Sequence, residues 1–157
     1  MKRLSTFAIA CLIAGFTATM IACNNSGPDK NPEVKFQSDL AGTNEVPRVT
    51  TNATGRLEGT YNKITKKFTY SITYSGLTPI AGHIHFGGFN ENGNVIYPFP
   101  SLASPITGTW DVDLKYENAL FGEYLYVNLH TAANRGGEIR GQVFSTDFYN
   151  KYLKNTK

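Results

Sequence analysis

The sequence predicts an all-β domain that folds as an antiparallel β-sandwich of about eight strands. Short segments alternate apolar and polar residues, which is the period of a strand with one buried face. Glycines and prolines stand between these segments, where strands would turn. The segments recur at intervals close to those of sandwiches and barrels. A closed antiparallel barrel is the alternative architecture.

The first residues have the pattern of an export signal. After two basic residues comes an apolar run, residues 4–22, that ends at Cys23. Its nineteen residues approach the roughly 20 that a membrane helix needs, but four hydroxyl residues and Gly15 disfavour a stop-transfer segment. Met20-Ile21-Ala22-Cys23 resembles the lipobox of bacterial-type lipoproteins, whose cysteine sulfur receives a diacylglyceryl group. We predict a lipoprotein signal peptide over residues 1–22 and lipidation of Cys23. The alternative is a plain signal peptide with an incidental cysteine.

Processing leaves a nearly neutral domain without a free thiol. Cys11 leaves with the signal and Cys23 carries the lipid, so neither a disulfide nor a thiolate metal site is expected. Loss of Lys2 and Arg3 lowers the formal net charge by two from +3. Such a domain has no electrostatic footprint for nucleic acid, so the expected partner is the membrane, through the lipid anchor. Asn24 favours sorting to the outer membrane if the host has two membranes.

The mature chain divides into a linker, a β domain and a tail. Residues 23–33 are polar, with two prolines and a glycine, and form a flexible linker behind the lipidated cysteine. The β domain occupies residues 34–146. The expected strands, in chain order, are residues 34–40, 55–61, 68–74, 80–86, 94–97, 110–115, 124–130 and 138–143. Residues 147–157 form a short helix, with Asp147 as a candidate N-cap, or a frayed tail. No other helix is expected.

All three histidines fall in predicted strands. His83 and His85 are two residues apart, so both side chains point to the same face of their strand. His130 shares its parity with Asn128, on the face opposite Leu125, Val127 and Leu129. The pattern therefore predicts three outward-facing histidines.

A hairpin is expected after His130. Its simplest register pairs His130 with Glu138 and Asn128 with Arg140, which would let Glu138 orient the imidazole of His130. Three neutral imidazoles suit zinc or copper, provided that the strand ends converge. His83, His85 and His130 are thus candidate ligands, with Glu138, Asn128 and Arg140 around them. The alternative is a set of strand histidines that only pair with carboxylates or cap carbonyl groups.

Other chemistries have less support in the sequence. The mature chain has no thiol nucleophile, and no serine stands in a Gly-x-Ser-x-Gly setting. The glycine-rich turns lack the strand, turn and helix context of a phosphate loop. Asp111 and Asp113 fit a solvated strand face better than a catalytic carboxylate pair. We therefore expect a module that is not an enzyme.

Several blocks of sequence resemble the CHRD domain family, the modules named after chordin. They span about Phe36 to Phe144 in the family's order and spacing, and the last of them is the most specific. The blocks are Leu40-Ala41-Gly42-Thr43-Asn44-Glu45-Val46-Pro47, Ser75-Gly76-Leu77-Thr78-Pro79, Gly82-His83-Ile84-His85-Phe86-Gly87, Tyr126-Val127-Asn128-Leu129-His130-Thr131 and Gly137-Glu138-Ile139-Arg140-Gly141-Gln142-Val143. The resemblance implies a β-rich extracellular module, without implying a defined activity.

A fainter resemblance links the histidine strand to another β-sandwich family. Gly76-Leu77-Thr78-Pro79 followed by His-x-His is similar to the copper-binding strand of Cu/Zn superoxide dismutases. Those enzymes use a larger set of histidines than the three of this chain, so dismutase activity is not expected. The fold implied by these likenesses is an immunoglobulin-like or superoxide-dismutase-like sandwich. Two functions stay open: a non-catalytic module that binds a protein, glycan or envelope partner, and a metal-binding domain.

Overall fold

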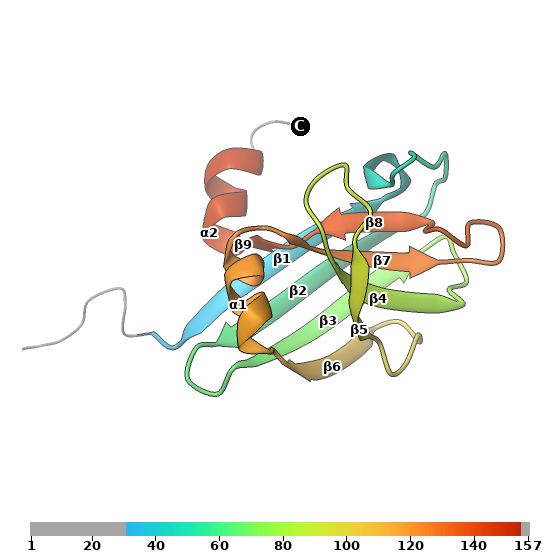
Figure 1. The fold of residues 1–157 in the computed structure, drawn as a ribbon. Coiled ribbons are helices and arrows are strands. Elements are labelled where there is room, and N and C mark those ends of the chain that lie inside the picture. Colours follow the sequence, from blue (N-terminus) through green and yellow to red (C-terminus); the bar gives the residue numbers. More distant parts are fainter. Residues whose placement is uncertain (1–30, 155–157) are drawn as a thin grey trace, which may run out of the picture. The chain divides into compact units, whose positions relative to one another are not determined.

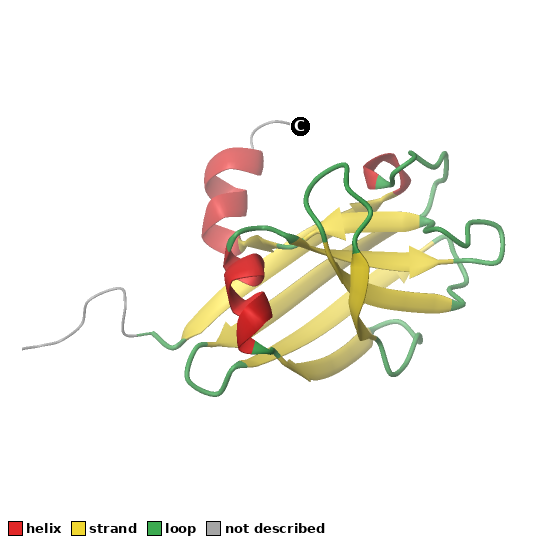
Figure 2. Ribbon diagram, in the orientation of Figure 1, coloured by secondary structure: helices red, strands yellow, loops and turns green. Residues whose placement is uncertain are grey.

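The computed structural model describes residues 31–154, which form a mostly β domain (Figures 1 and 2). The predicted signal peptide, Cys23 and most of the linker lie outside the described residues. Within that range, none of the helices has the length and apolar character needed to cross a membrane. The strands are β1 (Glu33–Ala41), β2 (Thr54–Asn62), β3 (Lys67–Ser75), β4 (Ala81–Phe86), β5 (Asn94–Pro98), β6 (Ile106–Asp111), β7 (Leu125–His130), β8 (Ile139–Gln142) and β9 (Phe144–Ser145).

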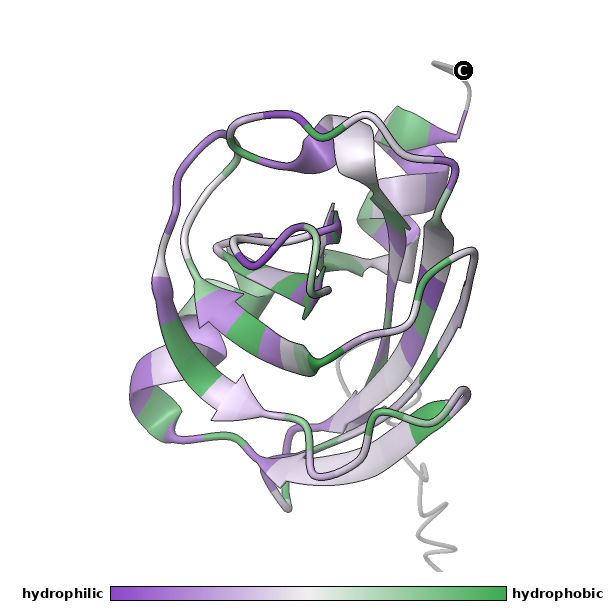
Figure 3. Ribbon diagram, turned by 90° about the vertical axis from the view of Figure 1, so that its right-hand side faces the viewer, coloured by the Kyte–Doolittle hydropathy of each residue, from purple (hydrophilic) through white to green (hydrophobic). Residues whose placement is uncertain are grey.

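All strand pairs are antiparallel and belong to one sheet, in the order β5-β4-β7-β8-β1-β2-β3-β6, with β9 beside β1. Seen end-on in Figure 3, this sheet curls almost completely round. Its two four-stranded halves meet at β8 and β1, where Ala41 pairs with Arg140, and β9, which follows β8, adds two further pairs with β1. The prediction of an all-β antiparallel fold is confirmed. The layers of the expected sandwich are halves of one continuous, nearly closed sheet.

The core lies inside the curled sheet and follows the predicted alternation. On β3, Phe68, Tyr70 and Ile72 are buried, whereas Thr69 and Thr73 are exposed. Both halves supply residues that are almost fully buried, so one apolar interior holds them together. These include Leu40, Leu57, Ile72, Ile106, Ile84, Val127, Leu129 and Ile139.

One helix was not expected. Residues 110–115 were predicted as a strand, but β6 ends at Asp111 and α1 (Leu114–Phe121) follows. The side chain of Asp113 caps this helix, since it accepts a hydrogen bond from the backbone N–H of Lys115 at 3.1 Å. Leu114 therefore points to solvent instead of continuing the buried face. The helix buries Leu120 in the core and carries the chain from β6 to β7.

The predicted C-terminal helix is present. It begins as α2 (Thr146–Phe148) and continues as a π-helical turn, η3 (Tyr149–Leu153). Its N-cap is Ser145 rather than Asp147, because Ser145 Oγ accepts from the backbone N–H of Phe148 at 3.3 Å.

Candidate metal centre

The outer face of β4, β7 and β8 is polar, yet it is buried. All six residues of β7 are buried, including those that point away from the core. Two loops account for this: residues 42–53 between β1 and β2, and residues 87–93 between β4 and β5. The loops also bond to each other, since Asn92 Nδ2 donates to the carbonyl of Val46 at 2.8 Å. We call this covered face the polar layer.

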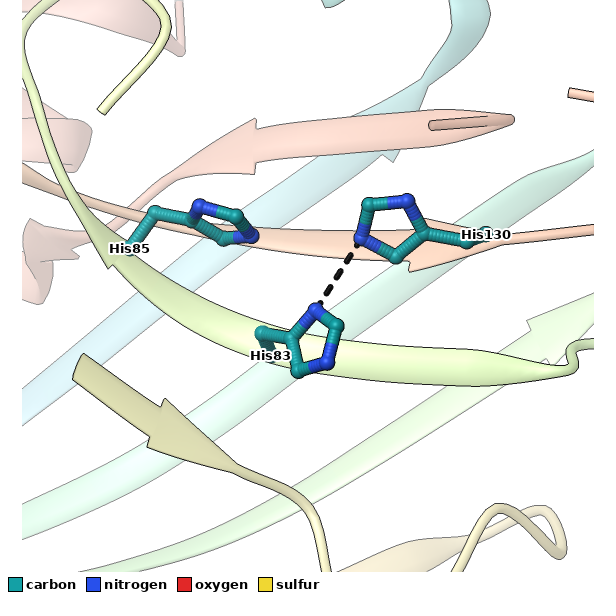
Figure 4. A group of neighbouring side chains, drawn as sticks. All are labelled: His83, His85 and His130. Atoms are coloured by element: carbon teal, nitrogen blue, oxygen red, sulfur yellow. Dashed lines mark hydrogen bonds between the residues drawn. The ribbon is translucent and has the colours of Figure 1, made fainter. Parts of the chain in front are cut away.

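Three histidines lie together in the polar layer (Figure 4). His83 and His85 come from β4, and His130 ends the neighbouring strand β7. One ring nitrogen of each lies within 4.8 Å of the others. Nδ1 of His83 is 3.1 Å from Nε2 of His130, the dashed line in Figure 4. The fold thus brings together the three side chains that alternation places on one face.

Backbone carbonyls orient two of the three rings. Nδ1 of His85 lies 3.0 Å from the carbonyl oxygen of Gly93, and Nδ1 of His130 lies 2.9 Å from that of Arg135. Because a carbonyl oxygen can only accept, Nδ1 carries the proton in both rings and Nε2 keeps its lone pair. The Nε2 atom of His85 is buried and has no hydrogen-bond partner within residues 31–154. Both rings are held in the tautomer that ligates a metal through Nε2.

Glu138 does not take the orienting role expected for it. Its carboxylate accepts hydrogen bonds from Thr131 at 2.9 Å and from Asn134. Hydrogen bonds, chiefly from Thr51, hold the pKa of Glu138 below its usual range. The carboxylate therefore braces the loop between β7 and β8, and a backbone carbonyl orients His130 in its place.

Asn128 and Arg140 tie the polar layer to the covering loops. The two residues pair across β7 and β8, so the predicted hairpin register is confirmed. Asn128 Nδ2 donates to Glu45 Oε2 at 3.4 Å, which connects it to the first loop. Arg140 Nη2 donates to the carbonyl of Gly88 at 2.8 Å, which connects it to the second. The loops are thereby fixed over the histidines.

Tyr126 and Gly93 are parts of the site that sequence reasoning missed. The ring of Tyr126 stacks on that of His85, with centroids 4.7 Å apart and planes 8° apart. Gly93 donates its N–H to the Tyr126 hydroxyl at 3.0 Å and accepts from His85 through its carbonyl. Alternation places Tyr126 on the same face as Asn128, which is a usable signal. The role of Gly93 could not be predicted in the same way, because every residue has a backbone carbonyl and the residue type does not show which one orients a ring.

Burial sets the charge state of the polar layer. It is the main cause that lowers the pKa of both His83 and His85, so these imidazoles are neutral near pH 7. It also raises the pKa of Glu45 to about 7, against the opposing effect of Arg140. Neutral imidazole is the form of histidine that binds metals.

The chemistry of this donor set fits a borderline transition metal. Imidazole nitrogens suit zinc and copper. In a tetrahedral zinc site, bonds of about 2.0–2.1 Å place neighbouring nitrogens roughly 3.4 Å apart. The His83 and His130 nitrogens already meet that spacing, at 3.1 Å. Three protein ligands leave a fourth position open.

The family of the chain follows from a direct comparison. The family model of the CHRD domain matches residues 36–143, which is more than half of the sequence. The chain belongs to the CHRD domain family. The matched segment of this CHRD domain includes all three histidines and both covering loops. No similar curated protein and no similar solved structure was found. Membership of the CHRD family supports a binding or structural module.

Proposed function

We propose that this protein is an extracytoplasmic CHRD module that binds one zinc or copper ion through His83, His85 and His130. A lipid on Cys23 would hold it at a membrane, in the outer membrane where the host has one. The observation that carries the metal proposal is the buried Nε2 of His85, which faces the other two rings without a hydrogen-bond partner among the described residues (Figure 4).

The energetic argument starts from that atom. A buried acceptor without a partner costs about 1–3 kcal/mol. The hydrogen bond that His85 donates to the Gly93 carbonyl keeps a proton on Nδ1, so Nε2 could gain one only by forming a charged imidazolium, which burial disfavours. A metal ion at the centre of the three nitrogens would satisfy Nε2 and leave the hydrogen bond intact. This is why metal binding is favoured over a purely hydrogen-bonded cluster.

A second candidate is a module that binds a protein or glycan partner without a metal. It is supported by CHRD membership alone. Under this candidate the polar layer is a structural network, and the histidines serve only to join β4 and β7.

A metal titration separates the two candidates. The full chain with Cys23→Ser, purified without a histidine tag and freed of metal, is titrated with Zn²⁺ and with Cu²⁺. We expect one ion per chain, and nitrogen hyperfine splitting from the three imidazoles in the electron paramagnetic resonance spectrum of the copper form.

The control is a chain in which all three histidines are alanine. Since the sequence has three histidines in total, this variant has none left. Affinity at least tenfold weaker in the variant supports the proposal. Equal affinity in both chains leaves the partner-binding module. His85→Gln provides a milder variant that keeps a hydrogen-bond donor for Gly93, should the triple variant not fold.

A further inference from the structure

Arg140 is a buried charge with an incomplete set of partners. Its side chain is 2% exposed, and its Cζ lies 3.4 Å from the ring centroid of Tyr126. Nη2 donates to the carbonyl of Gly88. Nη1 is buried and meets no acceptor within residues 31–154. Burying a guanidinium is costly unless its N–H groups are paired, so an unpaired Nη1 points to a ligand that is missing from this site.

A cavity of about 420 Å³ adjoins Arg140. It lies between the end of β1, strand β8, the loop of residues 87–93 and the C-terminal helix. Arg48 supplies further donors to its wall, and Phe89, Phe144 and Leu153 supply apolar surface. Phe89 is 58% exposed, and its ring centroid lies 5.6 Å from that of Phe144. The volume is within the range of sites that bind small molecules.

The charged residues that line the cavity are two arginines, Arg48 and Arg140, and one aspartate, Asp39. The Asp39 carboxylate is bound by Arg56 Nη1 at 2.7 Å and by the Tyr149 hydroxyl at 2.6 Å. Two other carboxylates act on Arg140 through space: Glu45, bonded to Asn128, and Glu91, bonded to the N–H of Gly88. Neither forms a hydrogen bond with the guanidinium. Arg48 is exposed and has no ion-pair partner within the described part of the chain.

We propose that this cavity binds a small organic monocarboxylate. The carboxylate would pair with Arg140 and Arg48, and its aliphatic or aromatic body would lie against Phe89, Phe144 and Leu153. A planar guanidinium suits a carboxylate, and the mixed wall suits a ligand that is anionic at one end and apolar at the other. An inorganic phosphate has no apolar part that could contact Phe89, Phe144 and Leu153. None of the three histidines lines this cavity, and the carboxylate would not need a metal, although Arg140 contacts Tyr126, whose ring stacks on His85.

The test uses 3-phenylpropionate, octanoate, neutral 3-phenylpropanamide and inorganic phosphate as probes. Binding to the full chain with Cys23→Ser is measured by calorimetry and saturation-transfer NMR at low ionic strength. The protein is metal-free, so that a carboxylate cannot be bound as a metal ligand. We expect saturable binding of one or both carboxylates, and at least tenfold weaker binding of the amide and of phosphate.

Variants locate the site. Arg140→Gln should weaken carboxylate binding at least tenfold. Arg48→Glu, an exposed substitution that does not threaten folding, should weaken it at least threefold. Lys35→Glu makes the same charge change at an exposed position away from this cavity and should leave binding unchanged. The proposal is overturned if no carboxylate binds, if amide or phosphate binds equally well, or if Arg48→Glu and Lys35→Glu behave alike.

Discussion

At His85, burial and hydrogen bonding together decide which nitrogen is free. The Gly93 carbonyl fixes the proton on Nδ1, and the stacked ring of Tyr126 limits rotation of the imidazole. The lone pair on Nε2 is left in a place that water does not reach. A backbone carbonyl thus orients this candidate ligand, where a carboxylate commonly performs that task in metal sites.

A second residue, Glu45, makes the stability of the domain depend on pH. Its pKa is raised to about 7 by burial, so the folded state holds the proton that the unfolded state releases near pH 4.5. The stabilisation from this proton is complete below pH 4.5 and is lost as the pH rises through 7. Two charged groups act on Glu45: Arg140 lowers its pKa and Glu138 raises it.

We therefore expect Glu45→Gln to flatten the fall in stability between pH 4.5 and 7, by up to about 3 kcal/mol. Urea unfolding at a series of pH values measures this difference. Glu58→Gln, at a side chain that is 76% exposed, is the matched control and should keep the slope of the parent chain. If Glu45→Gln kept that slope too, the carboxyl of Glu45 would not be the group responsible.

At the scale of elements, the loop of residues 87–93 covers the polar face of the sheet and orients one candidate ligand, His85. Its last residue, Gly93, contacts both His85 and Tyr126. A Cβ at this position would lie 1.6 Å from the carbonyl oxygen of Phe86, which is main chain and cannot swing aside. Only glycine permits the approach.

Gly93→Ala is accordingly expected to displace the loop and lower the free energy of unfolding by about 3 kcal/mol. The affinity for metal should fall with it, because His85 loses the carbonyl that orients its ring. Urea unfolding and a copper titration measure the two effects. Gly136→Ala is the matched control, since a Cβ there meets nothing within 4 Å. Equal stability of both variants would show that the loop tolerates a side chain at position 93.

The same elements show what the sequence can and cannot predict. Strand faces follow from alternation, and His83, His85 and His130 follow from the faces, because side-chain direction repeats every two residues. The path of a loop has no such period, so the sequence pattern did not predict that residues 42–53 and 87–93 cover the polar layer. The helix α1 was missed because Leu114 continues the alternation of Trp110 and Val112. Asp113, as an N-cap, was the signal against a strand.

At the scale of the whole molecule, the two halves of the sheet differ in their outer surfaces. The half of β1, β2, β3 and β6 presents threonines to solvent, among them Thr69 and Thr107. The half of β4, β7 and β8 carries the histidines and both covering loops. The candidate metal ligands and Arg140 are therefore confined to one half of the sheet, whereas both halves contribute to the core.

The anchor is also a property of the whole molecule, and it stays a prediction because Cys23 lies outside the described residues. Cys23→Ser should move the protein from the membrane fraction to the soluble extract, since each buried acyl methylene contributes about 0.8 kcal/mol to membrane binding. Cell fractionation with immunodetection measures the shift. Cys11→Ser, inside the predicted signal, is the control and should leave the membrane fraction unchanged. Membrane recovery of the Cys23→Ser chain at the normal level would contradict lipidation.

The incomplete closure of the sheet has an optical consequence. β5 and β6 are the two ends of the strand order and share no hydrogen-bonded ladder, but Tyr97 stacks on Trp110 across them, with centroids 5.5 Å apart. Trp110 is the one tryptophan in the chain. Its fluorescence therefore reports on this junction and on the neighbouring helix α1, whose Tyr116 ring lies 6.4 Å away, whereas far-ultraviolet circular dichroism follows all the strands. Comparing the two signals during unfolding shows whether β5 and β6 separate before the hydrogen-bonded ladders between the strands are lost.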